Sequence, residues 1–241
     1  MLNATKTIRY LILAGITALA VSPVTSANET TAKEVVPGLW EYTGLITSSG
    51  VDMPLTGIFL FADGTFVQQA IFDGEPFSEQ GSMAHSGPYT GSDAGIALIA
   101  KQTLSIDPSS DEPLTSMGIT THDLTVERDG NEMTLVFGAG TGTIQTLTLV
   151  SDAESVAMYT LENGTLAFTG THFLLVNGDE SSALSGYGTY VQAGDDYSLM
   201  VTRWSESDGD RAENLKDTEM SFTFDGSQLT LDDGRQIAVI D

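Results

Sequence analysis

The chain contains no cysteine among its 241 residues. This absence excludes disulfides, thiolate metal sites, a cysteine nucleophile and the lipid-modified cysteine of a bacterial lipoprotein. Basic residues are also scarce, with 9 Lys and Arg against 33 Asp and Glu. Because so acidic a surface repels other polyanions, we expect neither nucleic acid nor an anionic membrane as a partner. A 3.6-residue apolar period is missing after Val35, which argues against amphipathic helices.

The first 27 residues have the organisation of a secretory signal peptide. Lys6 and Arg9 supply a basic start, and the sequence TSA ending at Ala27 supplies a cleavage site. The apolar run at 10–21 is shorter than the roughly 20 residues that span a bilayer, which makes an uncleaved anchor the weaker alternative. Cleavage after about Ala27 leaves 7 of the 9 basic residues and all 33 acidic ones, a formal charge of −26. We therefore predict a bacterial periplasmic or extracellular protein with no stable membrane insertion after signal cleavage.

The rest of the chain has a β pattern. Short runs rich in Val, Ile, Leu, Thr, Phe and Tyr alternate with Asn-Gly and Asp-Gly pairs, the strongest local signal for a hairpin. These pairs stand at 63–64, 73–74, 129–130, 163–164, 177–178 and 225–226. Around the pair at 129–130, Leu124 and Val126 alternate with polar residues, and Met133 and Leu135 repeat the alternation. The sequence predicts an all-β fold with antiparallel meander connections.

The chain also repeats itself. The segment DLTVERDGNEMTL at 123–135 aligns without a gap on EMSFTFDGSQLTL at 219–231, and SMAHSG at 82–87 matches SSALSG at 181–186. Further matches, in the same order along the chain, pair 42–43 with 159–160 and 55–57 with 168–170. An ordered series of this kind indicates an internal duplication.

The repeat defines the domain organisation that we expect. Residues 1–27 are the signal peptide, 28–34 a linker, 35–150 the first repeat and 151–241 the second repeat. Because closure removes exposed strand edges, we predict that each repeat forms its own barrel, giving two tandem barrels. The alternative is one larger barrel built from both repeats.

Three segments of the first repeat carry a family resemblance. The Gly-x-Trp at Gly38-Leu39-Trp40, FADGTFVQQ at 61–69 and MAHSGPYTGSD at 83–93 resemble bacterial lipocalin-like (calycin-type) domains. The resemblance implies a barrel that binds a small apolar or amphipathic molecule. It also implies that Trp40 packs across the closed end, usually against an arginine of the last strand. Arg128 comes too early for a last strand, Arg235 belongs to the second repeat, and Ala157 stands where the repeat places the counterpart of Trp40.

Alternation and turn placement predict the residues that line the first barrel. They are Tyr42, Phe59, Phe61, His85, Tyr89 and Met133. His85 and Tyr89 have the same strand parity, and a neutral imidazole beside a phenol can orient a ligand carbonyl or act as a base. In the second repeat Leu184 replaces His85 and Thr218 replaces His122, so the fold itself requires neither histidine.

Other site chemistry has little support in the sequence. The three histidines offer no close-spaced ligand pair, and the acidic loop at 205–214 does not have the spacing of an EF-hand. We therefore assign no catalytic residue, metal or cofactor.

Two alternatives to a binding protein stay open. One is a barrel enzyme of the cyclase, isomerase or hydratase type with His85 as acid or base, and the other is a ligand-free structural or surface module.

Overall fold

The computed structural model describes residues 31–91, 95–140 and 142–240. The predicted signal peptide and the first residues of the predicted linker lie outside these ranges. The described helices are three short turns, namely α1 (Ala32–Val35), the 3-10 turn η1 (Phe77–Glu79) and α2 (Phe137–Gly140). None of the described helices is long and apolar enough to cross a bilayer. Nearly all other structure is antiparallel β-sheet, which confirms the predicted fold class.

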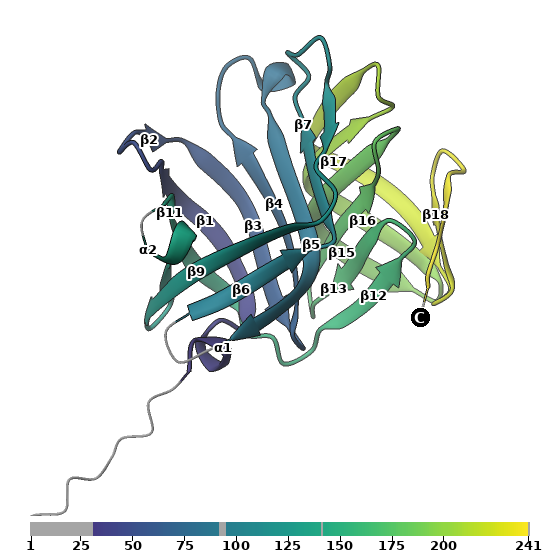
Figure 1. Ribbon diagram of the computed structural model, residues 1–241. Helices are drawn as coiled ribbons and strands as arrows, with labels where there is room; N and C mark the ends of the chain where they lie inside the picture. The colour runs from purple at the N-terminus through teal and green to yellow at the C-terminus, as the bar shows by residue number, and fades with distance from the viewer. Residues whose placement is uncertain (1–30, 92–94, 141, 241) are drawn as a thin grey trace, which may run out of the picture.

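The first sheet closes on itself to form barrel 1 (Figure 1). Its eight barrel strands pair in chain order, and β4 pairs with β5 as well as with β3, which completes the ring. The strands of the ring are β1 (Gly38–Ile46), β3 (Leu55–Ala62), β4 (Thr65–Phe72), β5 (Ser82–Gly91), β6 (Gly95–Ala100), β9 (Thr120–Asp129), β10 (Glu132–Val136) and β11 (Ile144–Ser151). Three further strands extend the sheet beyond the ring, namely β2 (Asp52–Met53), β7 (Gln102–Ile106) and β8 (Leu114–Ser116).

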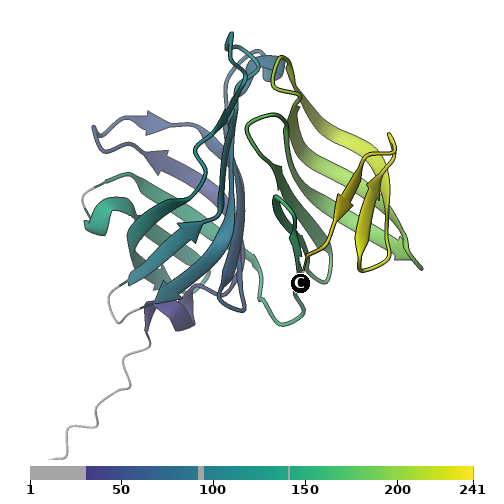
Figure 2. The ribbon, with the colours of Figure 1, turned by 45° about the vertical axis from the view of Figure 1, so that its right-hand side comes forward.

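The second sheet forms barrel 2, which stands beside barrel 1 (Figure 2). Its strands, again in chain order, are β12 (Ala157–Leu161), β13 (Gly164–Phe168), β14 (His172–Gly178), β15 (Ala183–Ala193), β16 (Asp196–Ser207), β17 (Ala212–Phe224), β18 (Gln228–Leu231) and β19 (Gln236–Ala238). A single bridge between Leu161 and Val239 joins the two ends, so barrel 2 is nearly closed. The prediction of two tandem barrels is confirmed, and the alternative of one larger barrel is wrong.

The repeated segments occupy equivalent strands. Residues 123–135 form the β9–β10 hairpin, the sixth and seventh strands of barrel 1, and 219–231 form the β17–β18 hairpin, the sixth and seventh strands of barrel 2. Residues 82–87 likewise begin the fourth strand of barrel 1, and 181–186 lead into and begin the fourth strand of barrel 2. The strand positions therefore agree with the duplication seen in the sequence.

Strand pairing corrects two of the sequence matches between the repeats, namely 42–43 with 159–160 and 55–57 with 168–170. Across the first four strands of barrel 1, directly paired residues are Trp40, Phe59, Gln68 and His85. The corresponding residues of barrel 2 are Leu161, Gly164, Asn177 and Leu184. The counterpart of Trp40 is therefore Leu161 and not Ala157. The match of 55–57 with 168–170 is also wrong, because residues 55–57 begin the second strand of barrel 1, whereas 168–170 lie at the end of the second strand of barrel 2 and just after it.

Trp40 fills the closed end of barrel 1, beside α1. Its side chain is completely buried, and its indole N–H donates a hydrogen bond of 2.8 Å to the carbonyl oxygen of Val36. The Arg128 guanidinium lies 4.8 Å from the centre of the indole ring, a cation–π contact, and donates to the carbonyl oxygen of Val35 at 2.8 Å. Arg128 thus covers the tryptophan although it comes from the sixth strand of the barrel, and not from the last as the resemblance implied.

The two barrels share a buried apolar interface. The outward-facing residues Val67 and Ala84 of barrel 1 belong to the same buried cluster as Val176 and Ala183 of barrel 2. The Gln69 side chain crosses between the barrels, and its amide nitrogen donates to the carbonyl and hydroxyl oxygens of Ser185 at 3.1 and 2.9 Å. These contacts use the outer faces of β4, β5, β14 and β15, so both lumens remain separate from the interface.

Candidate functional site

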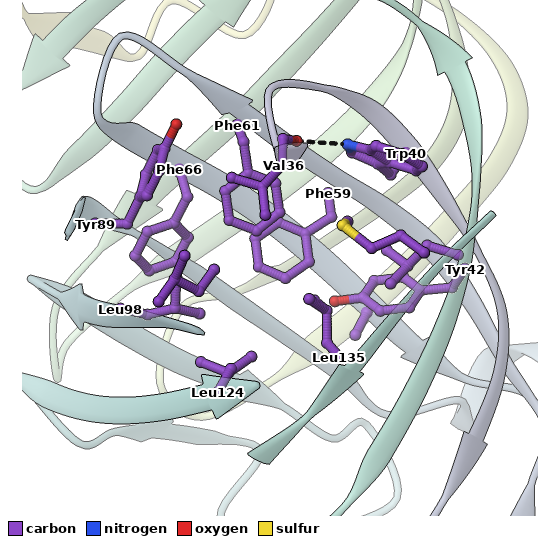
Figure 3. Close-up of a cluster of buried hydrophobic side chains, with 14 of the residues drawn as sticks. Val36, Trp40, Tyr42, Phe59, Phe61, Phe66, Tyr89, Leu98, Leu124 and Leu135 are labelled. Carbon is purple, nitrogen blue, oxygen red and sulfur yellow. Dashed lines mark hydrogen bonds between the residues drawn. The ribbon is translucent and has the colours of Figure 1, made fainter. Parts of the chain in front are cut away.

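The lumen of barrel 1 has an apolar half next to α1. Phe59 stacks on Phe61 with ring centres 4.2 Å apart, and Tyr89 meets Phe61 edge-on at 5.3 Å (Figure 3). Met133 belongs to the same buried cluster and is 1% exposed. Five of the six residues predicted to line the lumen, namely these four and Tyr42, therefore point inward and belong to this cluster. This half of the lumen is occupied by side chains.

The pairing of His85 with Tyr89 is not what strand parity led us to expect. Both side chains are buried, but Tyr89 lies against Phe61 near the Asp63-Gly64 turn. Burial and the Asp63 carboxylate raise the pKa of the Tyr89 phenol. His85 lies four residues earlier on β5, which places it nearer the end of the barrel opposite α1. We call that end the mouth.

A polar cluster occupies the mouth half of the lumen. The Tyr42 hydroxyl donates a hydrogen bond of 2.8 Å to Gln68 Oε1, and Gln68 Nε2 lies 3.0 Å from His85 Nδ1. The imidazole of His122 stacks parallel to that of His85, with ring centres 5.9 Å apart and 2° between the planes. We call Tyr42, Gln68, His85 and His122 the mouth cluster. It joins β1, β4, β5 and β9 in one polar layer.

The outer side of the mouth cluster is held by hydroxyls and one aromatic ring. His122 Nε2 lies 3.1 Å from Thr120 Oγ1, which in turn lies 2.8 Å from Thr103 Oγ1. The Phe137 ring, at the start of α2, meets His122 edge-on at 5.8 Å. His85 is 5% exposed, whereas His122 and Phe137 are partly exposed. His85 is therefore the deeper of the two histidines.

Burial keeps the mouth cluster uncharged. Desolvation, reinforced by the nearby His122, lowers the pKa of His85 from 6.5 to about 4. Desolvation also lowers the pKa of His122, and it raises the pKa of the Tyr42 phenol well above its ordinary value. Both imidazoles are neutral at pH 7 and the phenol keeps its proton. The layer thus offers hydrogen-bonding groups without a net charge.

Two inward-facing polar atoms in the mouth half of barrel 1 are buried without a hydrogen-bond partner among the described residues. They are His85 Nε2 and Gln145 Oε1. Gln145 lies at the start of β11 and pairs with Leu45 and Leu135, both of which belong to the core of barrel 1. A buried polar atom that lacks a partner costs about 1–3 kcal/mol, and folded proteins rarely leave one without a reason. A water molecule or a ligand can supply the missing bonds at these two atoms.

Two members of the mouth cluster, His122 and Gln68, were not among the predicted lining residues, and Gln68 was missed altogether. It alternates with Phe66 and Ala70 on β4, and both of those side chains belong to the core of barrel 1. A glutamine at an inward position of a buried strand is uncommon because its amide must find partners inside the barrel. That alternation, visible in TFVQQAIF, is the signal that would have identified it.

Barrel 2 has a different mouth. A cavity of about 230 Å³ is lined by Asn177 and Leu184, the counterparts of Gln68 and His85, and by Arg235. Arg235 is already engaged, because its guanidinium bonds to Glu206 at 2.8 Å and pairs with Asp233. The nearby acidic loop is held by its own backbone, since Asp208 Oδ1 accepts hydrogen bonds from the amides of Asp210 and Arg211. The residues described here form no cluster of three or more histidine, aspartate or glutamate side chains fit to hold a metal ion.

Comparison of the chain with family models, with curated proteins and with solved structures finds no match in any of the three. The eight-stranded barrels and the mouth cluster are the features from which a function can be inferred.

Proposed function

We propose that the chain is an exported, lipocalin-like protein that binds a small apolar or amphipathic molecule in the mouth half of barrel 1. The observation that carries the proposal is His85 Nε2, which is buried in the mouth cluster without a partner among the described residues. An eight-stranded barrel is wide enough for its own side chains or for one small ligand. The sequence of residues 1–27 and the strongly acidic composition support export.

The mouth half suits an amphipathic ligand because polar and apolar groups meet there. The mouth cluster supplies hydrogen bonds, and Leu135 of β10 and Phe137 at the start of α2 supply apolar contacts beside it. A ligand that reaches His85 has to move His122 and Phe137 aside. Both side chains are partly exposed and lie on the solvent side of His85, so entry does not disturb the packed phenylalanines of the closed half.

Binding is favoured over the two alternatives. An effective general base has a pKa near the working pH, and a pKa of about 4 makes His85 a weak base at neutral pH. A ligand-free module gains nothing from an unpartnered imidazole nitrogen in its core, since leucine (Leu184) fills the same position in barrel 2. The mouth cluster of barrel 1 is thus best explained as a recognition site.

Nile red, a neutral dye with an apolar ring system and a carbonyl group, provides a direct test. We expect saturable, one-to-one fluorescence enhancement with the wild-type protein. His85→Leu, which copies barrel 2, should weaken binding about tenfold through the loss of one buried hydrogen bond. His172→Leu is the matched control, because His172 is half-buried on β14, a strand of barrel 2, and lies outside the core of that barrel. Non-saturable enhancement, or equal binding by all three proteins, would contradict the proposal.

A further inference from the structure

We infer that the ligand of barrel 1 presents a hydrogen-bond-accepting oxygen, and that His85 Nε2–H donates to it. This inference rests on the proposed function and adds to it the chemical class of the ligand. The shared chemistry is a carbonyl or carboxylate oxygen attached to an apolar body. The direction of the hydrogen bonds through the mouth cluster carries the argument.

The first step fixes the orientation of the Gln68 amide. Tyr42 is buried, and its described hydrogen bond is the one to Gln68 Oε1. With the opposite amide orientation, Gln68 would donate to the phenol oxygen and the Tyr42 proton would be left without an acceptor. An unpaired buried hydroxyl proton is costly, so the hydroxyl donates and the Gln68 carbonyl accepts. The phenol remains protonated because burial raises its pKa.

The second step fixes the tautomer of His85. With its oxygen turned to Tyr42, Gln68 directs its NH₂ group to His85 Nδ1 at 3.0 Å. Nδ1 therefore accepts, and a neutral imidazole that accepts at one nitrogen carries its single proton on the other. The ring is neutral at pH 7 because its pKa is about 4. Nε2 is then a buried N–H donor that lacks an acceptor among the described residues.

The third step follows from the donor. A ligand oxygen with a free lone pair accepts from His85 Nε2–H and so completes the chain of hydrogen bonds that runs from Tyr42 through Gln68 to His85. At His85 Nε2 an alkylammonium group would place N–H against N–H, and the nearest free acceptor, Gln145 Oε1, is an uncharged amide oxygen that cannot offset the lost hydration of a cation. Carbonyl and carboxylate ligands differ in one respect. A carboxylate beside His85 favours the imidazolium and raises its pKa, whereas a neutral carbonyl leaves the pKa low.

The tautomer is measured on the ligand-free protein by ¹⁵N–¹H correlation spectra of the histidine rings at pH 7. We expect His85 to carry its proton on Nε2. Tyr42→Phe removes the group that orients Gln68 and should yield a mixture of both tautomers, while Tyr190→Phe, the same change in barrel 2, should leave the His85 spectrum unaltered. A proton on Nδ1 in the wild-type protein overturns the inference.

Three probes with the same apolar chain test the ligand class, namely 2-octanone, octanoate and octylamine, each titrated in high salt to screen the charge of the protein. The site-specific readout is the ring signal of His85. We expect 2-octanone and octanoate to shift the Nε2–H signal and octylamine to leave it in place. Only octanoate should raise the pKa of His85. His85→Leu should bind 2-octanone about tenfold more weakly and should lose the preference over octylamine.

The outcomes separate the inference from the proposed function. If octylamine shifts the mouth-cluster signals and the two oxygen-bearing probes do not, the barrel binds ligands but the inference is wrong. If none of the three probes shifts any signal of the mouth cluster, the proposed function fails and the inference fails with it.

Discussion

Replacement of His85 by leucine should make the protein less sensitive to acid. Leucine is the matched substitution because Leu184 fills the same lumen position in barrel 2. The unfolded chain binds a proton on His85 near the ordinary pKa of 6.5, whereas the folded chain binds it only near 4. Between these values the unfolded state holds more protons, so the free energy of unfolding falls as the pH falls. The part of the free energy of unfolding that depends on neutral His85 is complete above pH 6.5, and it is lost as the pH falls from 6.5 to 4.

The size of the effect follows from the two pKa values. One pKa unit corresponds to about 1.4 kcal/mol, so the whole window is worth about 3 kcal/mol, and about 2 kcal/mol of it is lost between pH 7 and pH 5. The leucine variant lacks this loss. Titration of surface carboxylates affects both proteins equally and cancels in the comparison. His122 remains in both proteins, and its lowered pKa acts in the same direction.

Urea unfolding at pH 7 and pH 5 measures the effect. The wild-type protein should lose about 2 kcal/mol more than His85→Leu over this interval. His172→Leu controls for the removal of a histidine. Desolvation lowers the pKa of His172 and Glu41 opposes part of that shift, so this variant should lie between the wild type and His85→Leu. Equal losses by the wild type and His85→Leu would refute the claim that His85 is held neutral by burial.

Two further predictions concern the packing of each barrel. A methyl group at Gly186 would lie 2.1 Å from the Trp204 ring, so Gly186→Ala should lower the free energy of unfolding by about 1–3 kcal/mol, while Gly170→Ala, which meets open space, should change it little. Arg128→Met keeps an apolar chain over Trp40 but loses the charge and the hydrogen bond to α1, so it should cost about 1–2 kcal/mol in urea unfolding and increase the quenching of Trp40 fluorescence by acrylamide. Unchanged unfolding midpoints in Gly186→Ala or Arg128→Met would contradict the packing described for that barrel.

Much of the architecture could be predicted from the sequence because its signals are local. Asn-Gly and Asp-Gly pairs specify tight turns, and period-two alternation assigns side chains to a face, so the meander and the inward direction of Phe59, Phe61 and His85 followed directly. The repeat could be read for the same reason. Its hairpins at 123–135 and 219–231 keep their length, and each forms the same two strands of its barrel.

The contacts within the mouth cluster could not be predicted because they join residues that are distant in the chain. Tyr42 and Gln68 lie on different strands, and His122 of β9 reaches His85 of β5 past the intervening strand β6. Parity shows which way a side chain points but not how far along the barrel it lies. For this reason Tyr89 looked like the partner of His85 although it packs near the closed end. The contact of Arg128 with Trp40 was missed in the same way, since it crosses the barrel end from β9 to β1.

Native mass spectrometry of the mature protein, purified without detergent from cells that export it, tests the central claim most directly. We expect a mass above that of the bare chain, released on denaturation and absent from His85→Leu. The released compound should contain a carbonyl or carboxylate oxygen on an apolar body. A bare chain mass for the wild-type protein, or an added mass that His85→Leu retains in full, would contradict a ligand site at the mouth of barrel 1.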